Sequence, residues 1–401
     1  MTIPLTKARI PRMSSWPGKY VIGLTGNIAT GKSVVRKMLE HLGAFGIDAD
    51  GLSHQAMGKG GPAYAQVAQT FGRFIIGADG QIDRQALGSI AFTNPKALAQ
   101  LEAIIHPFVR QAVNLLAGRA GQRVIVIEAI KLLEGELAAL CDSIWVVNAS
   151  DEVRVNRLMQ KRGLTAEQAK QRMAAQSSQK EKIRRAAAVI ENDGSYEATW
   201  TQVQEAWASL VESPQEEARE SAMAAAPIPA IAKPGEMLNI TVRRGKPADG
   251  AVIAAFITAA SKNTRQLERA DVMAAFGQKA YLLAQVNGGI GALAGWQVEN
   301  LVARVDDFYL LDDIPADLVL GPLLDSIEAA SRELQSEAAF LFVPPAVHKS
   351  AAAVFNVAGY EAVDPATIGI AAWREAAKES QPPGTVVLFK KLREDRVLRP
   401  V

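Results

Sequence analysis

The sequence predicts an α/β protein of two domains, a parallel sheet with helices on both faces followed by a mixed α/β domain. Three observations support this prediction. Apolar runs alternate with helical patterns in the first half, which is typical of a parallel sheet covered on both faces. A glycine-rich motif directly follows the first apolar run. A charged stretch followed by an Ala/Pro-rich stretch divides the chain near its middle, and this composition favours an extended linker.

These features set the expected domain boundaries. We expect an N-terminal extension over 1–19, a first domain over 20–210, a linker over 211–236 and a second domain over 237–401. A formal net charge of +2 argues against a nucleic-acid-binding surface, and no apolar run is long enough to cross a membrane. The single cysteine, Cys141, excludes a disulfide within the chain and favours a cytoplasmic protein. The oligomeric state stays open.

In the first domain, we expect strands at the near-continuous apolar runs 20–25, 123–130 and 143–149. Helical patterns occupy 32–42, 95–106, 107–116, 151–161 and 166–176. Because the glycine-rich motif follows the first strand, it is expected at the carboxyl edge of the parallel sheet.

In the second domain, a strand at 239–244 and helices at 249–260 and 268–276 come first. A hairpin is expected from 279–286 and 292–298, because Asn287-Gly288 suits a type I′ turn. The remaining elements are expected as strand 301–305, helix 316–335, strand 339–343, helices 347–357 and 370–379, and strand 386–392.

The glycine-rich motif matches the G-x-x-x-x-G-K-[ST] loop that binds nucleoside triphosphates. Its glycines let backbone N–H groups converge on phosphate oxygens, Lys32 reaches the β- and γ-phosphates, and the Ser33 hydroxyl ligates Mg²⁺. We therefore expect a nucleoside triphosphate and Mg²⁺ as ligands. The expected nucleotide-binding residues of this segment are Gly26, Asn27, Ile28, Ala29, Thr30, Gly31, Lys32, Ser33 and Val34.

Two carboxylates, Asp48 and Asp50, follow the first helix. A carboxylate at a strand end beside the γ-phosphate can accept a proton from an attacking hydroxyl or hold the metal's water molecules. From position alone, a helix or turn cap is the alternative.

Taken with segments further along, the chain from about residue 20 to residue 210 resembles dephospho-coenzyme A kinase. The resemblance rests on the phosphate loop, on Asp48-Ala49-Asp50 with His54 and on several segments in the expected order. These are residues 80–87 (GQIDRQAL), residues 101–107 (LEAIIHP) and residues 189–194 (VIENDG). Kinases of another small hydroxyl or phosphate acceptor, and a nucleotide- or coenzyme A-responsive binding module without turnover, are the alternative readings.

The resemblance implies ATP-dependent phosphorylation of the 3′-hydroxyl of dephospho-coenzyme A. It assigns Asp50 as general base, implies a structural role for Asp48, and places Arg157 on a lid over ATP. Lys32 and Arg157 would supply charge to the transferring phosphoryl group. Asn192 would lie near the adenine of ATP, with a turn role as the alternative. Arg84 and His106 match the acceptor side.

The sequence departs from the family's pattern at Lys131, Lys161 and Ala187, which stands where Asp is common. Lys131 stands in a segment that is usually Pro-Leu-Leu, and we expect it to affect the acceptor-side groove. Lys161 stands where Arg is common, and we expect the neighbouring Arg162 to take over that phosphate contact.

The second domain, from about residue 237 to residue 392, resembles a Gcn5-related N-acetyltransferase (GNAT) in its order of elements. The family's pyrophosphate-binding loop carries paired glycines, which are absent from residues 311–321. Carboxylates add negative charge there, at Asp306, Asp307, Asp312, Asp313 and Asp317. We therefore expect an acetyltransferase-like domain without catalysis.

Overall fold

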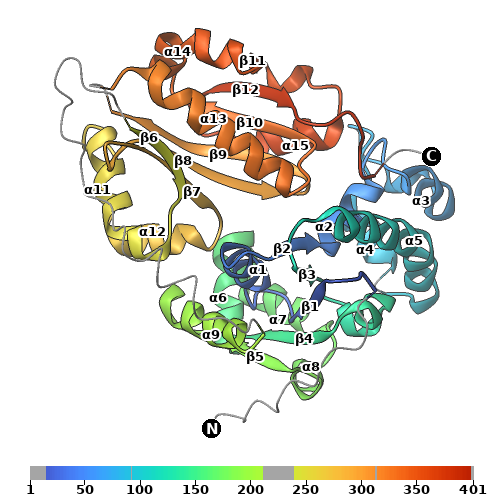
Figure 1. The fold of residues 1–401 in the computed structure, drawn as a ribbon. Coiled ribbons are helices and arrows are strands. Elements are labelled where there is room, and N and C mark those ends of the chain that lie inside the picture. The colour runs from blue at the N-terminus through green and yellow to red at the C-terminus, as the bar shows by residue number, and fades with distance from the viewer. Residues whose placement is uncertain (1–14, 92, 211–238, 312–313, 399–401) are drawn as a thin grey trace.

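The computed structural model describes residues 15–91, 93–210, 239–311 and 314–398. Most of the expected N-terminal extension 1–19, the expected linker 211–236, Asp312 and Asp313 therefore lie outside the described residues. Figure 1 shows two halves, one coloured blue to green and the other yellow to red, each built on its own sheet. The predicted fold class, a parallel sheet with helices followed by a mixed α/β part, is confirmed.

The first sheet has five parallel strands in the order β2-β3-β1-β4-β5. The strands are β1 (Tyr20–Thr25), β2 (Phe45–Asp48), β3 (Val124–Glu128), β4 (Ser143–Asn148) and β5 (Ala188–Glu191). Successive side chains of the central strands enter different hydrophobic clusters, Val21 and Ile22 for example. Both faces are therefore covered, as the apolar runs predict.

Helices pack on both faces of this sheet. The helix α1 (Lys32–His41) contacts α9 (Tyr196–Ala208) on one side, and α2 (Ala49–Met57) contacts α5 (Pro95–Arg119) on the other. The remaining helices are α3 (Tyr64–Phe71), α4 (Arg84–Ala91), α6 (Asp151–Arg162), α7 (Ala166–Ala174) and α8 (Gln179–Arg184).

The helix α5 corrects one expectation. The sequence predicts two helices that meet at Pro107, but the structure has one continuous helix with Pro107 inside it. Proline removes one helical N–H donor and usually ends or kinks a helix. Here Ile104, Ile105 and Val109 lie buried on either side of Pro107 in the same core cluster, so packing holds the two segments together.

The second sheet has seven strands in the order β11-β12-β10-β9-β8-β7-β6, antiparallel except for the β9–β10 pair. Its strands are β6 (Ile240–Arg244), β7 (Ala280–Val286), β8 (Gly289–Glu299), β9 (Val302–Leu310), β10 (Ala338–Val343), β11 (Glu361–Ala362) and β12 (Val386–Lys391). The predicted hairpin is present, and Asn287 and Gly288 adopt the positive φ angles, 50° and 87°, that a type I′ turn requires.

The helices of this half are α11 (Gly250–Ala260), α12 (Arg269–Phe276), α13 (Ala316–Glu333), α14 (Pro345–Val357) and α15 (Ala371–Ser380). One core cluster contains buried residues of α13 and α14, and another contains those of α11 and α12. In the part of the chain that the structure describes, no helix is both long and apolar enough to cross a membrane.

The two halves are joined by hydrogen bonds from α1 and α2 to backbone carbonyls of the C-terminal half. The pairs are Lys37 Nζ to Val298 O at 3.0 Å, His41 Nε2 to Phe276 O at 2.9 Å and Gln55 Nε2 to Asn300 O at 2.5 Å. Asn300 and Leu301, with φ angles of 52° and 63°, form the tight turn between β8 and β9. This turn therefore rests against the two helices that follow the phosphate loop and β2.

Candidate active site

The glycine-rich loop connects β1 to α1, as the sequence predicts. Gly31 precedes the helix with a φ of 93°, and a Cβ atom there would lie 2.0 Å from Asn192 Nδ2. Only glycine fits this backbone without strain. Lys32 is buried at the first helical position, whereas Ser33 is exposed. No side chain caps the helix, so the N–H groups of Lys32 and Ser33 at its start are left to bind an anion.

Two glutamines from the segment before and within α8 hold the start of the loop. Gln176 Oε1 accepts a hydrogen bond from the Ile28 N–H at 2.7 Å, and Gln179 Oε1 accepts one from the Asn27 N–H at 3.0 Å. A cavity beside these contacts is lined by α6, α7 and Asn27. The loop is therefore shaped by residues about 150 positions away in the sequence.

Arg157 and Asn192 brace the second half of the loop. Arg157 donates to Ala29 O and Thr30 O, both at 3.2 Å, and to Asn192 O at 2.7 Å. The Asn192 side chain donates to Thr30 O at 2.8 Å and accepts from the Thr199 hydroxyl at 3.0 Å. Both ends of the Asn192 amide are thus engaged within the protein, which leaves one N–H and one oxygen lone pair for any further contact.

The two carboxylates predicted from the sequence have different environments. Asp48 Oδ1 accepts from the Gly51 N–H at 2.8 Å and caps α2, which agrees with the structural role implied by the resemblance. Asp50, in the first turn, accepts from the Ile130 N–H at 3.0 Å. Burial raises the pKa of Asp50 to about 6, against the opposing effect of the Lys32 cation. A carboxylate with such a pKa is suited to accept a proton near neutral pH.

Lys32 and Asp50 belong to a buried charged cluster. Burial lowers the pKa of Lys32, and the charges of Glu128, Asp50 and Asp48 act in the opposite direction. Glu128, at the end of β3, also accepts from Arg36 Nε at 2.7 Å. The cluster places an ammonium group and a carboxylate at the carboxyl edge of the sheet, beside the anion-binding N–H groups.

Sequence reasoning missed Lys182 on α8. It is 2% exposed and donates a hydrogen bond to Ile130 O, and the N–H of the same residue donates to Asp50. Burial is the largest influence on the pKa of Lys182 and lowers it. The cation of Lys32 lowers this pKa further, whereas Asp50 acts in the opposite direction. No motif marks Lys182, since it stands in a charged run that is typical of a solvated helix.

The structure brings only one of the two predicted acceptor-side residues to a cavity. Arg84 begins α4 and lines a cavity together with His54 of α2. Partial burial and the Arg84 cation lower the pKa of His54, and Arg162 acts in the same direction. His106 is exposed on α5 and is not among the residues that line this cavity. Lys131 is paired with Glu102, one turn before His106, at 2.8 Å.

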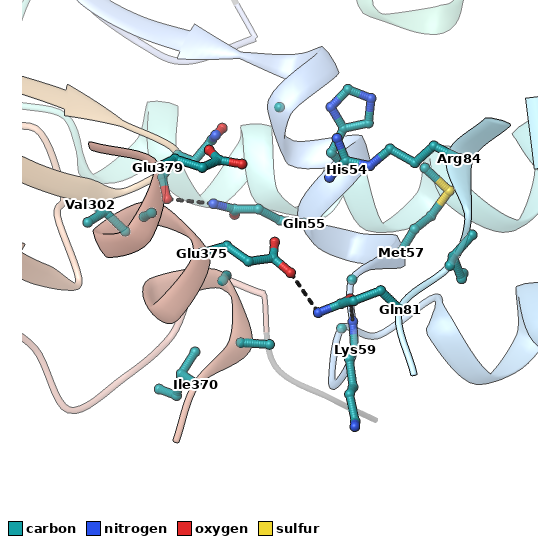
Figure 2. Close-up of a pocket in the computed structure, with 18 of the residues that line it drawn as sticks. His54, Gln55, Met57, Lys59, Gln81, Arg84, Val302, Ile370, Glu375 and Glu379 are labelled. Atoms are coloured by element: carbon teal, nitrogen blue, oxygen red, sulfur yellow. Dashed lines mark hydrogen bonds between the residues drawn. The ribbon is translucent and has the colours of Figure 1, made fainter. Parts of the chain in front are cut away.

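This cavity, of about 290 Å³, lies between the two halves of the chain (Figure 2). One wall comes from α2 and the segments 58–61 and 79–84, and the other comes from β9, α15 and the β8–β9 turn. Glu375 of α15 points across the cavity to Gln81 and accepts a hydrogen bond from it at 2.8 Å. Sequence reasoning predicted no site shared by the two halves.

The structure corrects the negative charge that was expected from Asp306 and Asp307 near a pyrophosphate loop in the second half. Asp306 and Asp307 lie within β9, which runs past the predicted end at residue 305. Lys279 Nζ pairs with Asp306 at 2.7 Å and with Asp307 at 3.0 Å, and Arg265 also pairs with Asp307. These two carboxylates are therefore neutralised inside the sheet. Asp317, in the first turn of α13, stays exposed.

A parallel sheet in the order 2-3-1-4-5, with a phosphate loop after β1 and a raised-pKa carboxylate beside its lysine, defines a P-loop kinase. The family model for dephospho-CoA kinases (CoaE) matches residues 20–198. The dephospho-CoA kinase of Geobacter sulfurreducens is 42% identical over 191 residues, which is 47% of this chain and 97% of the relative. Through this half, the chain belongs to the dephospho-CoA kinase family.

Comparison of structures gives matches to both halves. TT1252 from Thermus thermophilus has a TM-score of 0.43 and 30% identity, and the match covers 49% of this chain and 99% of that protein. An acetyltransferase of the GNAT family from Staphylococcus aureus has a TM-score of 0.32 and 14% identity, covering 39% of this chain and 100% of that protein. This second match concerns the fold of the C-terminal half alone.

Proposed function

We propose that the N-terminal half transfers the γ-phosphoryl group of ATP to the 3′-hydroxyl of dephospho-coenzyme A. The observation that carries this is the position of Asp50. It belongs to the buried cluster with Lys32, and His54, one turn further along α2, lines a cavity together with Arg84. A triphosphate on the loop and a hydroxyl beside Asp50 would then meet at the carboxyl edge of the sheet.

In this proposal, Asp50 accepts the proton as the hydroxyl oxygen forms its bond to the γ-phosphorus. The bond between that phosphorus and the β–γ bridging oxygen breaks, and ADP leaves with the electron pair. Lys32 and the N–H groups of α1 stabilise the charge on the phosphoryl oxygens. The Ile130 N–H holds the Asp50 carboxylate in place, and Lys182 in turn holds the Ile130 peptide.

The donor set near the loop fits Mg²⁺, which prefers oxygen ligands and keeps several waters. Ser33 supplies an exposed hydroxyl at the start of α1, and the carboxylates of Asp48, Asp50 and Glu128 lie around Lys32. When bound, the ion would neutralise charge on the β- and γ-phosphates. Ser33 is the residue we assign to hold it.

The charged residues of α6 have two roles in this proposal. Arg162 is exposed, and its cation lowers the pKa of both Lys32 and His54. We therefore assign it to the transferring phosphoryl group. Arg157 braces the loop through backbone carbonyls, and its contribution to catalysis is to hold the phosphate-binding backbone in shape. Asn192 supports the same backbone unit, and its remaining N–H and lone pair are the groups it would offer to adenine.

The test is direct detection of product. The full-length protein, ATP, Mg²⁺ and dephospho-coenzyme A should yield coenzyme A, heavier by one phosphoryl group, in a mass spectrum. The same protein carrying Lys32→Ala should yield none. Product with a nucleoside monophosphate but not with dephospho-coenzyme A would refute the acceptor, and ATP binding without any transfer would refute the reaction.

We further propose that the C-terminal half does not catalyse acetyl transfer. The supporting observations are the missing paired glycines in residues 311–321 and Asp317 in the first turn of α13, because a carboxylate there opposes a pyrophosphate at the helix start. Incubation with acetyl-coenzyme A and a panel of amines should release no coenzyme A above the level given by buffer. Release that depends on the protein would overturn this assignment.

A further inference from the structure

The cavity between the halves continues the proposed active site along α2. Asp50 and His54 are four residues apart, so they lie on the same side of this helix, about 6 Å apart along its axis. His54 and Gly51 line the cavity, and the negative charge of Asp48 opposes the lowering of the His54 pKa by burial. A molecule with its hydroxyl at Asp50 can therefore extend into the cavity without leaving the surface of α2.

The opposite wall carries a buried cation with an unused donor. Arg304 of β9 lines the cavity and is 8% exposed. Its Nη1 donates to Glu299 at 3.2 Å and to the Ser380 hydroxyl at 2.8 Å, but its buried Nε has no hydrogen-bond partner among the described residues. A buried guanidinium N–H without an acceptor costs free energy unless another group accepts a hydrogen bond from it.

The two walls also offer both kinds of polar group to one ligand. Lys59, Arg84 and Arg304 are cations, whereas Glu375 and Glu379 are carboxylates on α15. Figure 2 shows these two kinds of side chain, Lys59 and Arg84 from one half and Glu375 and Glu379 from the other, around the same space. A ligand that carries phosphate oxygens and, further along, amide N–H groups would satisfy both kinds.

We propose that this cavity binds the diphosphate-pantetheine arm of the acceptor, so that the C-terminal half forms one wall of the kinase's acceptor site. The inference rests on the proposed function, which places the acceptor's ribose at Asp50. The cations of the cavity bind the diphosphate, and the carboxylates of α15 accept hydrogen bonds from the amides of the arm. The C-terminal half is then a specificity-determining part of the kinase.

The test fills the cavity from the C-terminal wall in the full-length protein. Ala372 lines the cavity on α15, and Lys378 is exposed on the same helix outside it. Ala372→Trp should raise the KM for dephospho-coenzyme A about tenfold or more while the KM for ATP stays at the wild-type value. Lys378→Trp, the matched control, should change neither. An unchanged acceptor KM in Ala372→Trp would overturn the inference.

A second readout does not depend on turnover. Calorimetric titration of dephospho-coenzyme A without ATP should show the same loss of affinity in Ala372→Trp and none in Lys378→Trp. Arg304→Met should also weaken this binding, and Arg304→Lys should restore part of it because the charge returns. Equal binding by wild type, Ala372→Trp and Arg304→Met would refute the shared site. A wild-type protein that binds the acceptor but transfers no phosphate would refute only the proposed function.

Discussion

The pKa of Asp50 gives the sharpest prediction. Its rise from the ordinary value of 3.8 to about 6 corresponds to about 3 kcal/mol of preference for the protonated carboxyl. If Asp50 is the base, the ionised fraction is about nine tenths at pH 7 and about one tenth at pH 5. We therefore expect kcat/KM for dephospho-coenzyme A to fall about tenfold between pH 7 and pH 5.

The assay needs a direct readout of product by mass, with Mg²⁺ in excess, because coupling enzymes and ATP titrate in the same range. Asp48→Asn separates Asp50 from these other groups. Asparagine caps a helix as well as aspartate does, and it removes a charge that raises the Asp50 pKa. The acid limb of the profile should therefore move to lower pH in this variant.

Glu136→Gln is the matched control, because Glu136 is an exposed carboxylate that pairs with Arg110 and does not act on Asp50. Its profile should coincide with that of the wild type. A wild-type kcat/KM that is still on its plateau at pH 5, or an acid limb that Asp48→Asn leaves in place, would refute the assignment of Asp50 as base.

Three further predictions follow from the same structure. Asp50→Asn should lower kcat by about 10²–10⁴-fold and leave the calorimetric Kd for ATP unchanged, and a lost ATP affinity would count against its role at the acceptor. Gly31→Ala should lower the melting temperature and raise the KM for ATP, since φ is 93° and Asn192 occupies the space of a Cβ atom; an unchanged melting curve would contradict this strain. Burial lowers the pKa of His41, so unfolding binds a proton there at acid pH and the free energy of unfolding should drop as pH falls below about 6.5. His41→Asn should weaken this pH dependence. Free energies of unfolding from urea titrations that fall equally with pH in the wild type and in His41→Asn would contradict it.

Local features of the sequence were enough to predict the loop and the carboxylates. The loop motif, the strand before it and the helix after it are contiguous, so Lys32 and Ser33 could be placed without tertiary information. The short strands β2 and β5 at the edges of the sheet were not predicted, because four residues carry too little periodicity.

The contacts that complete the site come from distant parts of the chain. Lys182 and Arg304 approach α2 and its surroundings only after folding, and nothing in their neighbouring residues distinguishes them from surface cations. For the same reason the negative charge of Asp306 and Asp307 was overestimated from the sequence, since their partner Lys279 directly precedes β7, which is two strands away from β9 in the sheet.

The three hydrogen bonds that link α1 and α2 to the other half all have their donors on side chains of the kinase half and their acceptors on backbone carbonyls. Every residue type at positions 276, 298 and 300 offers a carbonyl, so these three hydrogen bonds depend on the course of the backbone there and not on the identity of the side chains. Sequence changes in the C-terminal half that keep this backbone in place therefore leave its three bonds to α1 and α2 intact. At these three contacts, the identity of the side chain matters on one half alone, at Lys37, His41 and Gln55.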